Sequence, residues 1–418
     1  MENNVELEKF SIGIGDRFGK ECIAQLEAVN QAKKLGVNLV PVWNKSFREH
    51  SIIGSNPVHT KRIVDSAIKD FKWKDSYYID ADHINYHSVD HFMDHSNFFT
   101  IDIGSYINKK ATDEETKVFL KEASVFIGTI EIPGVNKKFI IDDKLLLQTA
   151  EKYLAAIKEA GRIYRHILSK KKQNDFVVEI SFDEVDQPQT PIELFYIIAA
   201  VAYEKIPIQT IAPKFVGKFL KGIDYIGDVS VFEKEFEEII LVIEHSKRIF
   251  DLPKNLKLSV HSGSDKYSVY PIINKLIKKH NVGLHLKTAG TTWLEELIGL
   301  SSSGNNGLKL VKEIYSAGYS RYDELIQPYL HSVEISKEKL PLPSEVMEWD
   351  RERLVNTLRH EPKSKFLDTN FRQLLHISFK IAAEKGKIYY DAMEESKEII
   401  SSCVTNNLYE RHIKHIFL

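Results

Sequence analysis

Short apolar runs recur along the first part of the chain, most of them followed by a polar or glycine-containing turn and then by a helical pattern. The eight runs span residues 10–19, 37–43, 76–84, 97–104, 175–184, 206–217, 256–266 and 282–290. Alternation of such runs with amphipathic helical stretches favours a parallel sheet, whose strands are buried on both faces. Eight candidate strands over roughly 300 residues fit a TIM-type (β/α)8 barrel. We therefore predict an α/β fold of this class.

An open dinucleotide-binding sheet is the alternative α/β architecture. Residues 13–19, GIGDRFG, spell only GxGxxxG, which departs by one residue from the GxGxxG fingerprint. Asp16 and Arg17 would also be poor at approaching a pyrophosphate. No candidate strand is followed by GxGxxG or GxxxxGK[ST]. We therefore favour the barrel and expect no nicotinamide cofactor.

Two segments do not follow the strand–helix alternation. Residues 105–175 are lysine-rich with a helical pattern, and we interpret them as a helical insert on the barrel. After about residue 305 the candidate strands stop and helical patterns continue to the last residue. The sequence thus predicts a catalytic barrel over residues 1–305, insert included, and a helical C-terminal extension over residues 306–418 that packs on the barrel.

Composition excludes several classes of partner. With 57 Lys and Arg against 59 Asp and Glu, the formal net charge is −2, so no global attraction to nucleic acid or to an anionic membrane follows. The first ten residues lack the basic and apolar regions of a secretory signal, and no window approaches 18 consecutive apolar residues. Cys22 and Cys403 match no metal or redox spacing. We expect a cytoplasmic protein with two reduced structural thiols.

Polar side chains gather where several apolar runs end. These residues are Asp80, Asp82 and His83, then Glu179, Asp183 and Glu184, then His261, Asp265 and Lys266, and finally His285 and Lys287. Barrel enzymes carry their chemistry at the carboxyl ends of the strands, and barrel closure brings these ends together. This edge of the barrel is therefore the predicted active site.

Three of these residues are histidines at the ends of separate strands. Neutral imidazoles with a neighbouring carboxylate suit a catalytic divalent metal, so we predict His83, His261 and His285 as ligands. For each histidine taken alone, a structural hydrogen-bonding role is the alternative. His83 reaches the same side as Asp82 only if its strand has ended and the chain turns. Another histidine group, residues 87, 91 and 95, reads instead as the solvated face of a polar helix.

Two carboxylates are candidates for proton transfer. Asp80 and Asp82 share one face of their strand, and Asp82, nearer the strand mouth, is the predicted base. Asp80 is a candidate to support a histidine. Glu179 lies within an apolar run, where burial raises the pKa of a carboxyl group toward the working range of a general acid. A structural salt bridge is the alternative role for Glu179.

Three cationic residues also follow candidate strands. Arg17, Lys266 and Lys287 together suggest that an anionic substrate is held by charge-assisted hydrogen bonds. For each lysine taken alone, an exposed surface position is the alternative.

The ordered motifs of this chain resemble those of the tagaturonate/fructuronate epimerase family. The resemblance runs from about residue 11 to the last residue and is carried by GIGDRFG, WNKSFREHSIIG, DADHI, EISFDEVDQPQTP, KFVGKFLKGIDYIGD, HSGSDKYSVYP and HLKTAGTTWLEE. It implies a divalent-metal-dependent 4-epimerase of a keto-hexuronate in hexuronate catabolism. It also implies that Asp82 accepts a proton, that Glu179 donates one, and that His83, His261 and His285 bind the metal.

Other readings of the same residues stay open at this point. An epimerase of a neutral keto-hexose would share the site, a barrel metallohydrolase would need the same ligands, and a non-catalytic sugar-acid sensor would retain binding alone. The metal is left open among Mn, Co, Ni and Zn. The expected partner is a small sugar acid, and a second copy of the chain, in a homo-oligomer, is a further candidate.

Overall fold

The chain folds around a closed barrel of parallel strands, which a computed structural model describes for residues 5–172, 175–288 and 290–418. In sequence order the barrel strands are β1 (Phe10–Gly15), β2 (Leu39–Ser46), β3 (Tyr78–Ile84), β4 (Phe98–Asp102), β7 (Val177–Ser181), β8 (Thr210–Ala212), β9 (Lys257–His261) and β10 (Leu284–Lys287). Around the barrel they follow the order β1-β10-β9-β8-β7-β4-β3-β2. Each of the eight predicted runs contributes one strand, and the predicted TIM-type fold is confirmed.

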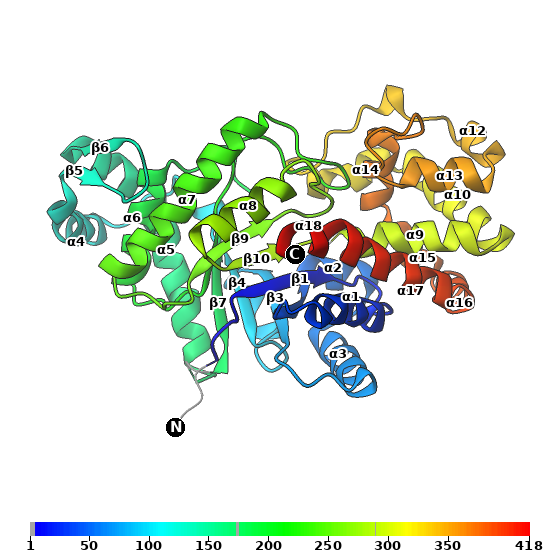
Figure 1. Cartoon of the computed structure of the whole chain (residues 1–418), viewed down its shortest axis with the longest axis horizontal. Coiled ribbons are helices and arrows are strands. Elements are labelled where there is room, and N and C mark those ends of the chain that lie inside the picture. Colours follow the sequence, from blue (N-terminus) through cyan, green and yellow to red (C-terminus); the bar gives the residue numbers. More distant parts are fainter. Residues whose placement is uncertain (1–4, 173–174, 289) are drawn as a thin grey trace.

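Helices cover the outside of the barrel (Figure 1). They are α1 (Cys22–Lys34), α3 (Pro57–Phe71), α5 (Asp143–Leu168), α6 (Pro191–Tyr203), α7 (Val229–Ile249) and α8 (Tyr270–His280). The side chains of Asn56, Asp142, Thr190 and Asp228 cap α3, α5, α6 and α7 by accepting hydrogen bonds from backbone N–H groups of the first turn. These caps satisfy donors that have no partner inside the helix and fix where each helix begins.

The connection from β3 to β4 differs from the others. Between these strands the described chain forms only a short 3-10 helix, η1 (Val89–His91), where the sequence predicted a polar α-helix. His87, His91 and His95 therefore do not share one helical face. The ring of His91 instead stacks on Phe47, with centroids 4.7 Å apart. The many turn-forming Asn, Asp and Ser residues of this segment compete with a helix for backbone hydrogen bonds.

The segment predicted as a helical insert is only partly helical. It holds α4 (Asp113–Ala123), but also an antiparallel hairpin of β5 (Gly128–Glu131) and β6 (Lys138–Ile141). Pro133 and Gly134 lie in the turn between these strands, where Gly134 adopts a φ of 89° that disfavours other residues. The long helix α5 belongs to the barrel wall, because it connects β4 to β7 and packs against α6. The hairpin and α4 project together from one side of the barrel (Figure 1).

A bundle of helices follows the last strand and has a hydrophobic core of its own. Its members are α9 (Thr291–Ser303), α10 (Asn305–Ser320), α11 (Tyr322–Ile326), α12 (Pro343–Glu348), α13 (Arg351–Leu358), α14 (Thr369–Ile377), α15 (Phe379–Lys385), α16 (Lys387–Glu395) and α17 (Lys397–Asn406). Buried Trp293, Leu297, Tyr315 and Phe371 contribute to this second core. Because α9 already packs into it, the bundle begins before residue 305; the division of the chain at that residue stays a prediction.

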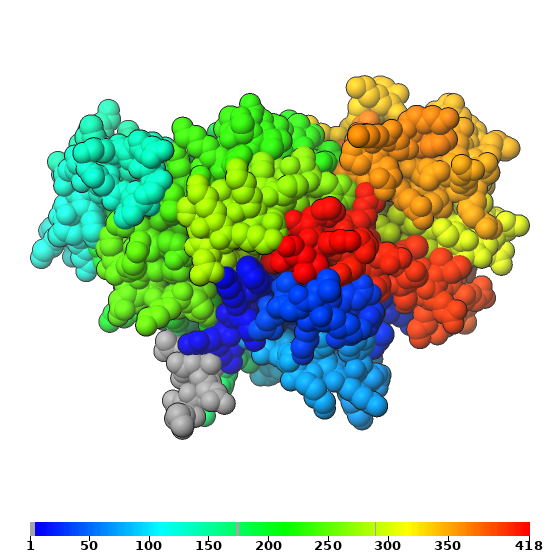
Figure 2. Space-filling view, in the orientation of Figure 1, coloured from blue at the N-terminus to red at the C-terminus, as the bar shows by residue number. Residues whose placement is uncertain are grey.

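The last residues leave the bundle and return to the barrel. A π-helical stretch, η7 (Asn407–Ile413), packs against α1, and α18 (Lys414–Phe417) packs against α8. The buried side chains of Ile413, Ile416 and Phe417 join the barrel core. The C-terminal segment thus lies beside the N-terminal strand and helix, red against blue in Figure 2. It covers β1 and β10, where a barrel of this class usually carries the helix that follows its last strand.

The described helices were also searched for membrane spans. None of those in residues 5–172, 175–288 and 290–418 combines the length and apolar character needed to cross a bilayer.

We predict that Phe417 stabilises the closed barrel. Its side chain is 4% exposed, and its ring lies 5.4 Å from the ring of Phe10. Replacing Phe417 by Ala should cost about 3 kcal/mol, because it leaves a cavity between α18 and β1. The midpoint of urea unfolding, followed by circular dichroism, should fall accordingly. Ile388→Ala, at a position that is 66% exposed in α16, serves as the control and should change little. Equal midpoints for the two variants would contradict a closing role for Phe417.

Candidate active site

A cavity of about 180 Å³ opens at the carboxyl ends of the barrel strands. Strand ends supply Asp82, His83, His261 and Lys287 to its lining, and the loop after β7 supplies Asp183. Its other side is lined by side chains of the helical extension, namely Pro328, Tyr329, His331, Ser332 and His376. A larger hollow of about 860 Å³ lies at the amino ends of the strands, which barrel enzymes do not use for chemistry. The smaller cavity is therefore the candidate active site.

The ammonium of Lys287 lies at the floor of this cavity, among three carboxylates. Its Nζ is 2.8 Å from Asp80 Oδ2, 3.0 Å from Asp82 Oδ1 and 2.9 Å from Glu179 Oε1. The same Nζ donates a hydrogen bond of 2.5 Å to Thr100 Oγ1. Side chains from β3, β4, β7 and β10 thus meet inside the barrel. Asp80 and Asp82 both reach Lys287 because residues two apart on a strand share a face.

Burial and these contacts determine the charge state of the cluster. Burial alone would lower the pKa of Lys287, but Asp80, Glu179 and Asp82 raise it well above its usual value. Burial raises the pKa of Asp80 to about 7 against the opposing effect of Lys287. For Asp82 the effect of burial is outweighed by Lys287, His83 and His261, which bring its pKa to about 2. Asp82 is therefore ionised where it lines the cavity.

The pKa of Glu179 moves in the direction opposite to the one that we expected from its apolar strand. Burial raises it, but Lys287 and His261 more than offset burial and hold the pKa well below its usual value. These contacts therefore keep Glu179 ionised, and its role as proton donor stays a prediction. The sequence could not show this, because both cations come from strands that lie far away along the chain. Glu179 is fully buried beneath His261 and Lys287, its two neighbours in the cavity lining.

His83 enters the cavity through an irregularity in β3. The pairing of β3 with β4 shifts register between Ala81 and Ile84, and His83 has a φ of 49°, in the left-handed region. Such a bulge turns one extra side chain to the same face of a strand. Asp82 and His83 can therefore both line the cavity although they are consecutive. Left-handed backbone is costly for a histidine and concentrates at functional sites.

His83 and His261 lie close together and are surrounded by carboxylates. Their ring centroids are 5.3 Å apart. His261 Nε2 is 2.8 Å from Glu179 Oε1, and its Nδ1 is 3.2 Å from Asp183 Oδ1. His83 Nδ1 is 3.4 Å from Asp102 Oδ2. Burial lowers the pKa of His261, but Asp183 and Glu179 outweigh it and raise the pKa to about 9. The negative field that raises this pKa also favours a bound cation.

Donor atoms of His83, Asp183 and His261 lie within 4.8 Å of one another, and so do those of His83, Asp102 and Glu184. His261 Nδ1 is buried and, apart from its ion-pair contact with Asp183, has no hydrogen-bond partner among the described residues. Imidazole nitrogens combined with carboxylate oxygens are a donor set typical of Mn, Co, Ni and Zn. These side chains therefore fit a divalent ion. Asp183 was visible in the sequence as a strand-end carboxylate, but its spacing did not identify it as a ligand.

His285 lies one layer deeper in the barrel than the other two histidines. It is paired in register with Ser11 of β1, and its Nδ1 lies 2.9 Å from Ser11 Oγ. The side chain is fully buried against Phe98, and burial lowers its pKa to about 3. His285 belongs to neither group of candidate ligands and does not line the cavity. The structure thus brings together two of the three predicted ligands, with Asp183 beside them.

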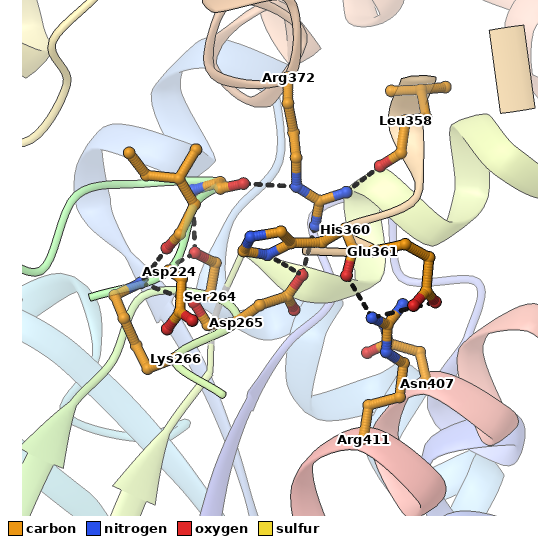
Figure 3. Close-up of polar contacts among 12 residues, drawn as sticks. Asp224, Ser264, Asp265, Lys266, Leu358, His360, Glu361, Arg372, Asn407 and Arg411 are labelled. Carbon is orange, nitrogen blue, oxygen red and sulfur yellow. Dashed lines mark hydrogen bonds and ion pairs between the residues drawn. The ribbon is translucent and has the colours of Figure 1, made fainter. Parts of the chain in front are cut away.

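The three cationic residues that were predicted to bind the substrate have different surroundings. Arg17 lines the cavity, but its Nε lies 3.3 Å from Glu49 Oε1 and its Nη1 donates to the carbonyl of His376 at 2.7 Å. The positive charge of Lys287 is balanced by its three carboxylate neighbours. Lys266 is fully buried outside the cavity lining, and its ammonium donates to Leu220 O at 3.0 Å and Ile223 O at 2.8 Å, among other oxygens. Figure 3 shows Lys266 beside Asp265 in this network. Lys266 therefore joins loops and does not face the cavity.

Comparison with known proteins relates the whole chain to one family. A family model described as UxaE, tagaturonate epimerase, matches residues 2–416. The tagaturonate/fructuronate epimerase of Thermotoga maritima is 27% identical over 423 residues, which cover 96% of this chain and 80% of that protein. Crystal structures of fructuronate-tagaturonate epimerase from Cohnella laeviribosi share the fold. The glycerol-complexed form has a TM-score of 0.81 and the native form 0.78, both at 22% identity, covering 99% of this chain and 82% and 83% of those chains.

We predict that a divalent ion binds to His83, His261 and Asp183. Purified protein should hold about one ion per chain, lose it to a chelator and recover it from Mn, Co, Ni or Zn, as measured by elemental analysis. His261→Gln and Asp183→Asn should each lose the ion. His285→Gln should retain it, because His285 lies outside both ligand groups. Loss of the ion from His285→Gln, with Asp183→Asn still loaded, would restore the ligand set expected from the sequence.

Proposed function

Since this chain belongs to the tagaturonate epimerase family, we propose that it interconverts D-tagaturonate and D-fructuronate by inverting C4, with a divalent metal ion, in hexuronate catabolism. The observation that carries this proposal is the pairing of an ionised Asp82 with the His83–Asp183–His261 group in one cavity. This isomerisation needs a base to accept a proton and a metal ion to stabilise negative charge, and the cavity offers a candidate for each.

The position of C4 restricts the chemistry. C4 lies two carbons from the C2 ketone, so the carbonyl does not acidify the hydrogen on C4. Hydride transfer would need a nicotinamide, and the strand ends carry no GxGxxG fingerprint. Retro-aldol cleavage needs only proton transfer and stabilisation of negative charge. We therefore assign the reaction to opening and re-forming of the C3–C4 bond.

Asp82 accepts the proton of the C4 hydroxyl in this scheme. The electron pair of the C3–C4 bond then moves to the C1–C3 fragment, which becomes an enediolate, and C4 becomes an aldehyde. The aldehyde fragment rotates and presents its other face, and the C3–C4 bond re-forms. A divalent ion bound by His83, His261 and Asp183 would supply Lewis-acid stabilisation of the negative charge on substrate oxygens.

Glu179 donates the returning proton. Because Lys287 and His261 keep Glu179 ionised, it must first take up a proton. Contacts of 3.0 Å from Asp82 Oδ1 to Lys287 Nζ and of 2.9 Å from Lys287 Nζ to Glu179 Oε1 offer a path for that proton. Glu179 Oε1 also lies 2.8 Å from His261 Nε2, which lines the cavity. Acceptor and donor are thus linked through Lys287, which contacts both.

Incubation of metal-loaded protein with tagaturonate should yield fructuronate of equal mass, as sugar analysis would detect. Asp82→Asn and Glu179→Gln keep the shape of each side chain but remove its proton transfer. Each variant should lower turnover by roughly 10²–10⁴-fold with near-normal metal content. Asp323→Asn, whose side chain is 86% exposed in α11, is the matched control and should leave turnover unchanged. If either variant lost its metal, the replaced residue would be a metal ligand, and the roles assigned to Asp82 and Glu179 would have to be revised.

A second prediction concerns the hydrogen on C4, which the retro-aldol route never removes. Substrate deuterated at C4 should give product that is still fully labelled. Turnover in D2O should place no solvent deuterium at that carbon, as measured by NMR. Wash-out of the label into water would rule out the retro-aldol route and favour direct proton transfer at C4.

A further inference from the structure

A keto-hexuronate differs from the corresponding keto-hexose by one carboxylate, so the cations of the cavity decide between these substrates. The cavity is lined by Arg17, Arg48, Lys214, Lys221 and Lys287. Lys287 has three carboxylate partners, and Arg17 is bound to Glu49 and to a backbone carbonyl. Arg48 is exposed and donates to Pro328 O at 3.3 Å. Among the described residues, the partly buried cations of the lining without a carboxylate partner are the two lysines of the β8–α7 connection, Lys214 and Lys221.

Lys221 is a partly buried cation without a counter-ion. In the part of the chain that the structure describes, no carboxylate oxygen lies within 4.0 Å of its ammonium, which is 5.7 Å from the ring centroid of Tyr329. Burial lowers the pKa of Lys221, and Glu184 only partly opposes this effect. A desolvated charge without a partner is costly, and a bound anion would offset that cost.

The backbone on both sides of Lys221 is held in place by a buried polar network. Lys266 donates to the carbonyls of Leu220 and Ile223, and the N–H of Gly222 donates to Ser264 Oγ at 2.8 Å. Arg372 Nε donates to the carbonyl of Gly222. Figure 3 shows Lys266 and Arg372 converging on this loop, with Asp265 between them.

The helical extension, which lines the opposite side of the cavity, also holds the backbone of Lys221 in place. The N–H of Lys221 donates to Ser332 O at 2.8 Å, in the extension. Gly222 has a φ of 79°, a conformation that favours glycine and that turns the loop immediately after Lys221. A side chain on a loop fixed in this way loses little further backbone freedom when it binds a ligand.

We propose that Lys221 binds the carboxylate of the hexuronate substrate. This inference rests on the proposed function, because it assigns the substrate's anionic end within the same cavity. After retro-aldol cleavage the carboxylate stays on the aldehyde fragment, which must rotate without leaving. An ammonium is a compact point charge and permits that rotation, whereas a guanidinium grips a carboxylate in a fixed bidentate geometry.

The test compares three lysines of the β8–α7 connection. Lys221→Met removes the charge but keeps the apolar stem. Lys214→Met tests the other lysine of the cavity. Lys218→Met is the matched control, because Lys218 is exposed and pairs with Glu334 outside the cavity lining. For each variant, KM and kcat are measured with tagaturonate, and inhibition is measured with the neutral ketose tagatose. Thermal unfolding and elemental analysis check folding and metal content.

We expect Lys221→Met to raise KM for tagaturonate by about 10- to 100-fold and to change the inhibition constant of tagatose less than about threefold. Lys221→Arg should leave KM within about threefold of wild type, because it keeps the charge, but should lower kcat, because a guanidinium holds the carboxylate in a fixed geometry. Equal losses for tagaturonate and tagatose, or a selective loss in Lys214→Met instead, would overturn the assignment.

Binding separates this inference from the proposed function. If wild-type protein failed to epimerise tagaturonate, the proposed function would fall. Calorimetric titration of tagaturonate into wild type and Lys221→Met would still decide the role of Lys221. Weaker binding in the Lys221 variant but not in the Lys218 variant supports it, and equal affinities overturn it.

Discussion

The buried ammonium of Lys287 is the interaction on which the architecture of the site depends. Three carboxylates from two strands surround it, and none of them would remain ionised in the barrel interior without a cation. Conversely, an unpaired ammonium at this depth would lose its charge. The barrel must therefore close with β3, β7 and β10 in register for these four side chains to meet. The barrel strands must thus pair correctly for the side chains of the site to hold their charges.

The same cluster separates the two aspartates of β3. Asp80, deeper and beside two other carboxylates, has its pKa raised, whereas Asp82, nearer the histidines, has its pKa lowered. Neighbouring acids whose pKa values are driven apart can hold different protonation states at one pH. The deeper member can thus carry a proton while the member that faces the cavity remains a base. This division of roles arises from position along a single strand, two residues apart.

The sequence predicts those features that depend on local patterns and misses those that depend on contacts between distant segments. Strands that are buried on both faces leave apolar runs, and their polar ends mark the site, so the eight strands and residues such as Asp82, His261 and Lys287 could be found. The bulge at His83, the depth of His285 and the burial of Lys266 depend on neighbours from other strands and from the extension. The hairpin β5–β6 was missed because short, partly exposed strands have little apolar signature. Thr100, which contacts Lys287, was not among the predicted site residues.

The placement of η7 and α18 has a consequence for how this chain reaches its fold. The wall over β1 and β10 is completed by a segment that a ribosome synthesises only after the whole helical bundle. Until then, apolar side chains such as Phe10 lack their final partner. The first strand must therefore wait for nearly the entire polypeptide to emerge, and contacts of such long sequence separation form slowly. During synthesis this seam is the surface on which a chaperone would act, or from which aggregation would begin.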